Sequence, residues 1–97
     1  MATKEQILDT LRRLKGNLHS RYRVNEIGLF GSAVRGEQTE FSDIDVLVEF
    51  EKGADLLDVS GLKIFLEEQF KQKVDVVSKR ALRHEFRDQV LREVVQA

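Results

Sequence analysis

The chain has 97 residues, of which 41% are hydrophobic and 34% are charged, and its formal net charge is -1. This length suits one folded domain with a single core, and the composition excludes a disordered chain. The balance of charges argues against a protein that coats nucleic acid, so we expect no direct nucleic-acid binding.

Residue types that are missing or rare narrow the chemistry further. There is no cysteine, and the two histidines, His19 and His84, are far apart in sequence. Disulfides, thiolate zinc sites and a cysteine nucleophile are therefore excluded, and a bound metal should have oxygen ligands. The sequence has neither an apolar run of membrane length nor an apolar N-terminal signal, which predicts a cytoplasmic protein without membrane contact.

The first part of the chain predicts a helix, a strand and a short helix. Apolar residues at steps of three and four indicate an amphipathic helix over about residues 4–18, with Thr3 as a candidate N-cap. Residues 24–30, VNEIGLF, have strand-like content and run into Gly31, which predicts a buried strand closed by a tight turn. We expect a short helix to begin at Ser32.

The middle of the chain continues this alternation. The segment DIDVLVEF, residues 43–50, predicts a strand in which one face is apolar and the other begins with two aspartates. A helix is expected over about residues 55–70, with Asp55 or Asp58 as its cap. Residues 73–78, KVDVVS, predict a third strand.

A last helix is expected over about residues 79–95. Its inward face should consist of apolar residues at helical spacing, namely Leu82, Phe86, Val90 and Val94. The whole order is helix, strand, short helix, strand, helix, strand, helix. Such alternation favours a single α+β domain over residues 1–97, in which a small mixed β-sheet is backed by helices.

Two aspartates at alternate positions of the second strand form a candidate site. Residues i and i+2 of a strand project to the same side, with Cα atoms about 6.5–7 Å apart, so Asp43 and Asp45 can converge on an ion. Unpaired carboxylates placed this way repel each other, and a divalent cation is the simplest compensation. Oxygen ligands suit Mg²⁺ or Mn²⁺, which commonly complete their shells with water and substrate phosphates. This predicts a nucleotide substrate.

Other residues extend this site. Asp75 in the third strand is a further carboxylate, and three carboxylates could hold two ions roughly 3.5–4 Å apart for in-line phosphoryl displacement. At the Gly31–Ser32 turn the backbone can approach a ligand closely, and the first N–H groups of the following helix favour an anion. Ser32 can donate its hydroxyl to a phosphate, and Arg35 adds a charged contact. GS or DID alone is common in turns and strand ends, so the order of these motifs carries the prediction.

In this order, the motifs LFGSAVRG, SDIDVLVEF and KVDVVS resemble the DNA polymerase β-like nucleotidyltransferase superfamily. The resemblance is specifically to its minimal nucleotidyltransferase branch, the MntA-like antitoxins of HEPN/MNT pairs. It covers most of the chain from Ile27 to Ser78, and no residue of the core motif is missing. It implies a small mixed sheet with helices, in agreement with the predicted elements.

The resemblance also implies roles for individual residues. Asp43 and Asp45 would carry two Mg²⁺ ions, with Mn²⁺ as a substitute, and Asp75 would complete the metal site and help to activate the acceptor hydroxyl. The nucleoside triphosphate, ATP, would be bound by four residues: Gly31, Ser32, Arg35 and Ser42.

Larger members of the superfamily carry extra domains that close over the substrate, whereas about one helix follows Ser78 here. We therefore expect a homodimer or a hetero-oligomer in which a second chain completes the site. The resemblance implies AMPylation of a tyrosine on a partner HEPN ribonuclease toxin, so that this chain is the antitoxin. The alternative is a non-catalytic nucleotide-binding module that neutralises its partner by binding. Transfer to a small molecule is disfavoured because the sequence indicates no acceptor pocket.

Overall fold

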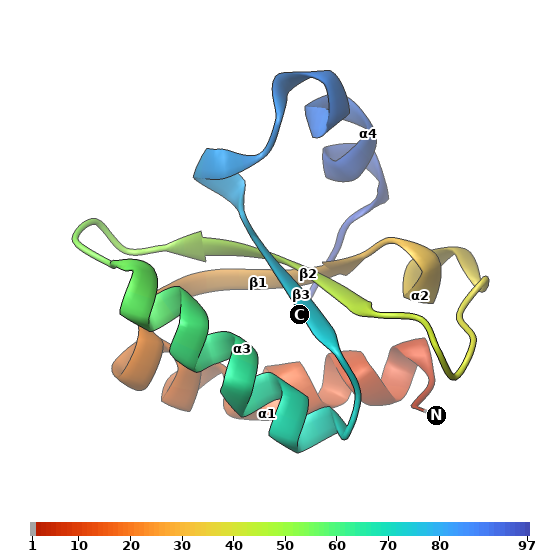
Figure 1. The fold of residues 1–97 in the computed structure, drawn as a ribbon, viewed down its shortest axis with the longest axis horizontal. Coiled ribbons are helices and arrows are strands. Elements are labelled where there is room, and N and C mark those ends of the chain that lie inside the picture. Colours follow the sequence, from red (N-terminus) through yellow and green to blue (C-terminus); the bar gives the residue numbers. More distant parts are fainter. Residues whose placement is uncertain (1) are drawn as a thin grey trace.

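A four-stranded mixed sheet organises residues 2–97, which the computed structural model describes (Figure 1). Along the chain the elements are α1 (Lys4–Tyr22), β1 (Val24–Phe30), α2 (Ser32–Arg35), β2 (Ile44–Phe50), α3 (Leu56–Phe70), β3 (Val74–Ser78), the 3₁₀ turn η1 (Lys79–Ala81), α4 (His84–Glu93) and β4 (Val95–Gln96). The strands lie in the order β3-β2-β1-β4. This architecture confirms the predicted mixed sheet backed by helices.

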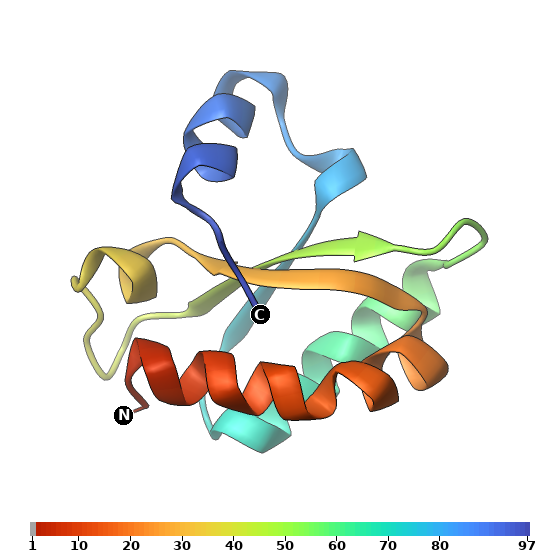
Figure 2. The same cartoon turned by 180° about the vertical axis from the view of Figure 1, so that it is seen from behind.

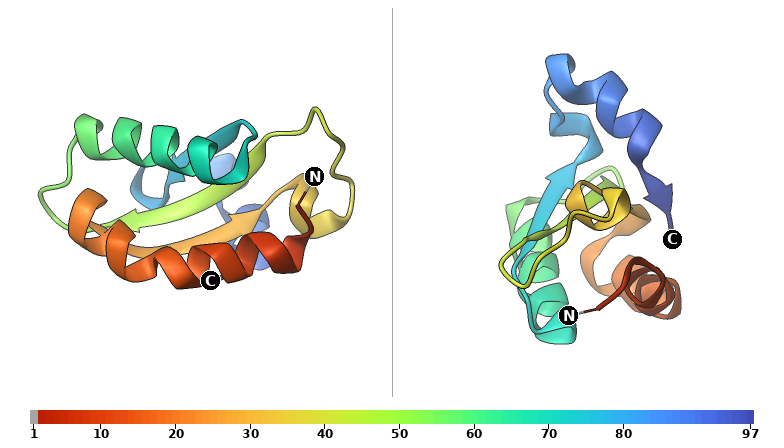
Figure 3. Two further views of the ribbon diagram at one scale, coloured as in Figure 1. Left: turned by 90° about the horizontal axis from the view of Figure 1, so that it is seen from below. Right: turned by 90° about the vertical axis from the view of Figure 1, so that its right-hand side faces the viewer.

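Strand direction follows from the connections. β1 pairs antiparallel with both β2 and β4, whereas β2 and β3 are parallel and are joined by the α3 crossover. α1 and α3 lie side by side against one face of the sheet, and α4 lies on the opposite side (Figures 2 and 3). One face is therefore covered by two long helices, and the other face is covered in part.

The core lies between the sheet and the α1–α3 layer. Its fully buried side chains come from both helices and from three strands: Ile7, Leu11, Leu18, Ile27, Leu29, Ile44, Val46, Val48, Leu62, Leu66 and Val74. These residues recur at helical spacing in α1 and α3 and at alternate positions in β2, as the sequence predicts. Within residues 2–97, no helix combines the length and the apolar character needed to cross a membrane.

Both long helices begin at the residues that the sequence indicates. The Thr3 hydroxyl accepts the Gln6 N–H of α1, and the Gln6 side chain accepts the Thr3 N–H in return. Asp55 caps α3 in the same way, with Asp58 as its reciprocal partner. α1 continues past residue 18 to Tyr22 because Leu18 is fully buried and anchors the last turn.

The helix expected over residues 79–95 is partly wrong. The chain forms η1 first, then the ten-residue α4, and it finishes as β4 on the edge of β1. Val94 has extended backbone angles, φ -62° and ψ 136°, and Val95 pairs with Leu29. Two adjacent β-branched residues suit a strand, and the free edge of β1 offers their backbone hydrogen-bond partners.

Candidate active site

The strand register brings the predicted carboxylates to one place. β2 and β3 align Asp45 beside Asp75, and in-register residues of neighbouring strands project to the same face. Asp43 lies two residues before Asp45, in the segment that leads into β2. Asp45 is partly buried, whereas Asp43 and Asp75 are exposed. Asp45 and Asp75 face α4, on the side of the sheet opposite to α1 and α3, and the charge of Asp43 is near enough to act on Asp45.

The electrostatics of Asp45 show how close these charges are. Burial raises the pKa of Asp45 from 3.8 to about 6, and the neighbouring carboxylates of Asp75 and Asp43 add to the rise, while the Arg35 guanidinium opposes it. The cluster is therefore short of positive charge. A set of ionisable oxygen donors that repel one another fits a hard divalent cation such as Mg²⁺ or Mn²⁺.

The carboxylates do not form a finished metal cage. Among residues 2–97, no three acidic or histidine side chains converge closely enough to ligate one ion. The chemistry of the donors thus fits a divalent cation, while the two-ion arrangement stays a prediction.

The turn after β1 has a backbone conformation that favours glycine. Gly31 has φ 79° and ψ -151°, a region that side chains with a Cβ rarely adopt. A Cβ on Gly31 would also collide with the Asp45 carboxylate, which lies directly against this position. The missing side chain therefore allows the Gly31–Ser32 turn to lie in contact with the carboxylate cluster, as its predicted role requires.

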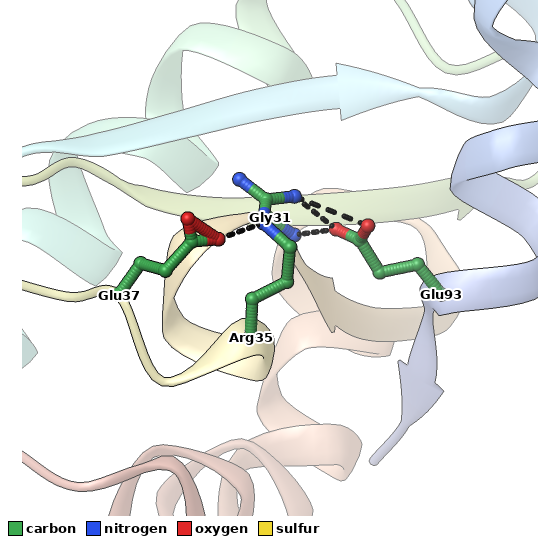
Figure 4. Close-up of polar contacts among 4 residues, drawn as sticks. All are labelled: Gly31, Arg35, Glu37 and Glu93. Carbon is green, nitrogen blue, oxygen red and sulfur yellow. Dashed lines mark hydrogen bonds and ion pairs between the residues drawn. The ribbon is translucent and has the colours of Figure 1, made fainter.

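Arg35 is held by two glutamates, which the sequence analysis did not identify (Figure 4). Its Nη1 donates to both carboxylate oxygens of Glu93, at 2.9 and 3.1 Å, and its Nε donates to Glu37 at 2.5 Å. Glu93 also accepts the backbone N–H of Gly31 at 2.5 Å. The hydrogen bonds that Arg35 donates to Glu37 and Glu93 raise the pKa of Arg35, so its positive charge is retained.

Ser42 occupies the loop that leads into β2. Its hydroxyl accepts the Thr39 N–H at 2.9 Å, and its carbonyl accepts a hydrogen bond from the Gln72 side chain at 2.7 Å. These contacts fix the loop immediately before Asp43. The expected contact between Ser42 and a nucleotide stays a prediction.

A cleft of about 320 Å³ brings together four of the seven predicted site residues, and Ser32, Ser42 and Asp43 do not line it. Gly31, Arg35, Asp45 and Asp75 line it from the sheet and α2, and α4 closes it with Phe86, Gln89, Val90 and Glu93. A larger hollow of about 610 Å³ lies at the other end of β2 and β3 and includes none of the predicted site residues. The smaller cleft is the candidate active site because Asp45, Asp75, the glycine turn and Arg35 meet there.

These features coincide with similarity to known proteins. Residues 11–96 match the nucleotidyltransferase domain family. The chain belongs to this family. This nucleotidyltransferase is 45% identical to the protein adenylyltransferase MntA of Thermococcus cleftensis over 95 residues, which are 98% of this chain and 96% of that protein.

Solved structures agree with this assignment. The nucleotidyltransferase is 43% identical to a protein described as a minimal nucleotidyltransferase, with a TM-score of 0.75 over 91% of this chain and 93% of that chain. It is 27% identical to a chain of a toxin–antitoxin crystal structure with AMP-PNP, with a TM-score of 0.71 over 87% of this chain and 69% of the other. The predicted fold, family and enzyme class are confirmed.

Proposed function

We propose that this nucleotidyltransferase transfers AMP from ATP to a tyrosine hydroxyl of a partner HEPN-type ribonuclease toxin, and that it acts as the antitoxin of the pair. The observation that carries the proposal is the alignment of Asp45 with Asp75, beside the Gly31 turn, on the open side of the sheet. The acceptor oxygen forms a bond to the α-phosphorus of ATP. The bond from that phosphorus to the bridging oxygen breaks, and pyrophosphate leaves.

The proposed metal ligands are the three carboxylates. Asp43 and Asp45 would hold Mg²⁺, with Asp75 completing the site. Burial and the neighbouring carboxylates of Asp75 and Asp43 together raise the pKa of Asp45, and this shortage of positive charge supports the assignment. Bound Mg²⁺ would neutralise charge on the phosphates and on the departing pyrophosphate. Asp75 is exposed on the sheet face, which suits the proposed removal of the proton from the acceptor hydroxyl.

The remaining site residues would orient the nucleotide. The Ser32 hydroxyl and the guanidinium of Arg35 would bind the triphosphate, because both border the cleft or its turn. Holding the α-phosphorus and the acceptor oxygen in line is itself a large part of catalysis in phosphoryl transfer.

Several observations support ATP and a protein acceptor. The Thermococcus relative is named a protein adenylyltransferase, and the toxin–antitoxin structure contains AMP-PNP, an analogue of ATP. In this chain, Asp45 and Asp75 line the cleft between the sheet and α4, and α4 lies on the side of the sheet opposite to α1 and α3 (Figure 1). A tyrosine presented by a second protein could approach the α-phosphate from that side.

The test uses ATP labelled at the α-phosphate, Mg²⁺, purified protein and a lysate of the native host. Wild type should label one partner protein, and mass spectrometry should find AMP on a tyrosine. The double variant Asp43→Asn/Asp45→Asn should transfer less than about 1% of the wild-type label, because the proposed metal ligands are lost.

A matched control is Asp9→Asn/Asp88→Asn, which removes two exposed carboxylates outside the cleft and should label like wild type. Equal labelling by the Asp43→Asn/Asp45→Asn variant would contradict the assignment of the site. If that variant transfers no AMP but still suppresses the partner in cells, neutralisation depends on binding rather than on catalysis.

A further inference from the structure

We propose that Glu93 is a positioning residue of this active site, which holds the Gly31 backbone and the Arg35 side chain in the arrangement that receives the triphosphate. The inference rests on the proposed function and extends it to the C-terminal end of α4. It assigns a role to a residue that the motifs do not contain.

The contacts of Glu93 join two parts of the site (Figure 4). One carboxylate oxygen accepts both the Gly31 N–H and an Arg35 N–H, and the other oxygen accepts a second bond from the same Arg35 nitrogen. Hydrogen bonds that involve a charged partner are stronger and more directional than neutral ones. The single carboxylate of Glu93 therefore fixes both the backbone at the start of the turn and the side chain of Arg35.

Burial distinguishes Glu93 from the other partner of Arg35. The Glu93 side chain is 15% exposed, whereas that of Glu37 is 60% exposed. A carboxylate so little exposed needs its bonds, because an unpaired buried charge is strongly destabilising. An exposed ion pair contributes little by comparison. Of the two glutamates, Glu93 is the one that determines where Arg35 lies.

The position of Gly31 matters for the chemistry. Its backbone has the wide conformational freedom of glycine, so an outside contact must select the conformation with φ 79°. The bond to Glu93 supplies this contact, and the Asp45 carboxylate packs against the same residue. Without Glu93, the Gly31–Ser32 turn would no longer be held in one conformation beside the Asp45 carboxylate.

A carboxylate bound to an N–H group and a guanidinium could instead occupy the place of a phosphate and block the site. Two features favour positioning. Within residues 2–97, the Ser32 backbone N–H takes part in no hydrogen bond to another backbone group, so it remains available beside the occupied Gly31. Arg35 also makes its contacts with Glu93 and Glu37 through Nη1 and Nε, so Nη2 is left for a ligand. The two roles predict opposite changes in nucleotide affinity.

The test measures the dissociation constant of AMP-PNP with Mg²⁺ by calorimetry, for wild type, Glu93→Ala and Glu93→Gln. Alanine should weaken binding roughly tenfold or more, because two charge-assisted contacts are lost. Glutamine keeps an acceptor oxygen for Gly31 and Arg35 and should bind within about threefold of wild type. The control is Glu85→Ala on the same helix, whose side chain is 64% exposed and pairs with Arg83; its affinity should not change.

A double-variant cycle separates positioning from general damage to the fold. If Glu93 acts through Arg35, the loss in Arg35→Ala/Glu93→Ala should be smaller than the product of the two single losses. Tighter binding in either Glu93 variant would show that Glu93 blocks the site, and unchanged binding in Glu93→Ala, or independent losses in the cycle, would also overturn the inference. Wild type that does not bind AMP-PNP would instead remove the proposed function, and the role of Glu93 with it.

Discussion

At Gly31 both the backbone conformation and the packing against Asp45 require glycine. The residue has φ 79°, and a Cβ there would meet the carboxylate of Asp45. We expect Gly31→Ala to lower the free energy of unfolding by about 1–3 kcal/mol through backbone strain, and to reduce AMP transfer at least about a hundredfold because Asp45 is displaced. Urea unfolding and the labelled-ATP assay measure the two effects.

The control for this prediction is Gly16→Ala. Gly16 lies within α1, and apart from its chain neighbours and the adjoining backbone of the helix nothing would lie within 4 Å of an added Cβ. This variant should be more stable than wild type by up to about 1 kcal/mol, because alanine favours a helix, and transfer should be unchanged. Equal behaviour of the two glycine variants would contradict the role of Gly31.

The carboxylate of Asp45 reduces the stability of the metal-free protein at neutral pH. Its folded pKa, about 6, lies above the ordinary value of 3.8, so the folded state holds this proton more tightly than the unfolded state. The stabilising contribution is present below pH 3.8 and is lost as the pH rises through about 6. Asp45→Asn avoids this loss and should be more stable than wild type by about 1 kcal/mol at pH 7.5 in EDTA, after allowance for solvent screening.

Thermal unfolding from pH 4 to pH 7.5 checks the sign of this effect. The difference between Asp45→Asn and wild type should be small near pH 4 and should grow up to about pH 7. The exposed Asp88→Asn variant serves as the control and should show no such trend. A difference that shrinks with rising pH would contradict the raised pKa.

At the level of elements, local patterns predicted the first six helices and strands well. The caps of α1 and α3 and the alternation of β2 are local signals, and the DID spacing indicates Asp43 and Asp45, whose role as metal ligands stays a prediction. The C-terminal segment was harder, because Leu82, Phe86 and Val90 repeat at helical spacing although α4 buries none of its residues. β4 exists through its pairing with β1, which no local pattern encodes.

The same reason explains why no sequence motif indicates Glu93. It lies 62 residues after Gly31, and their hydrogen bond depends on how α4 is carried over the sheet. The strand that contains Asp75 is indicated by its own sequence, and its parallel register with β2 then brings Asp75 beside Asp45. The spacing of motifs cannot indicate a residue such as Glu93, whose role depends only on tertiary contacts.

A substitution at Gly28 of β1 tests how tightly β4 packs on the edge of the sheet. A Cβ on Gly28 would lie 2.7 Å from a methyl carbon of Val94 and 3.1 Å from the carbonyl oxygen of Val95. We expect Gly28→Ala to push β4 away and to lower stability by about 1–3 kcal/mol. Hydrogen exchange should accelerate at Ala97, whose N–H donates to the Ile27 carbonyl at 3.0 Å, and not in α1. Unchanged protection at Ala97 would show that β4 tolerates the side chain.

In the whole molecule, the residues that stabilise the fold and the residues proposed for activity lie in different layers. α1 and α3 lie on one side of the sheet and α4 on the other (Figure 3). The fully buried side chains belong to the α1–α3 layer and the strands it covers, whereas Asp45 and Asp75, which repel each other, line the cleft beside α4. The groups assigned to the metal and the nucleotide therefore lie outside the main core. Their substitution should alter ligand binding without unfolding the protein, so the two effects can be measured independently.

This separation predicts a reversal in thermal stability. Without ligand, Asp43→Asn/Asp45→Asn should melt above wild type, because carboxylate repulsion is relieved. With Mg²⁺ and AMP-PNP at about a hundred times the dissociation constant, wild type should gain about 2.7 kcal/mol, or roughly 10 °C in a domain of this size, and the variant should gain little. The control Asp9→Asn/Asp88→Asn should gain as much as wild type. Equal gains in wild type and the Asp43→Asn/Asp45→Asn variant would mean that the nucleotide binds without these carboxylates, and the metal site would have to lie elsewhere.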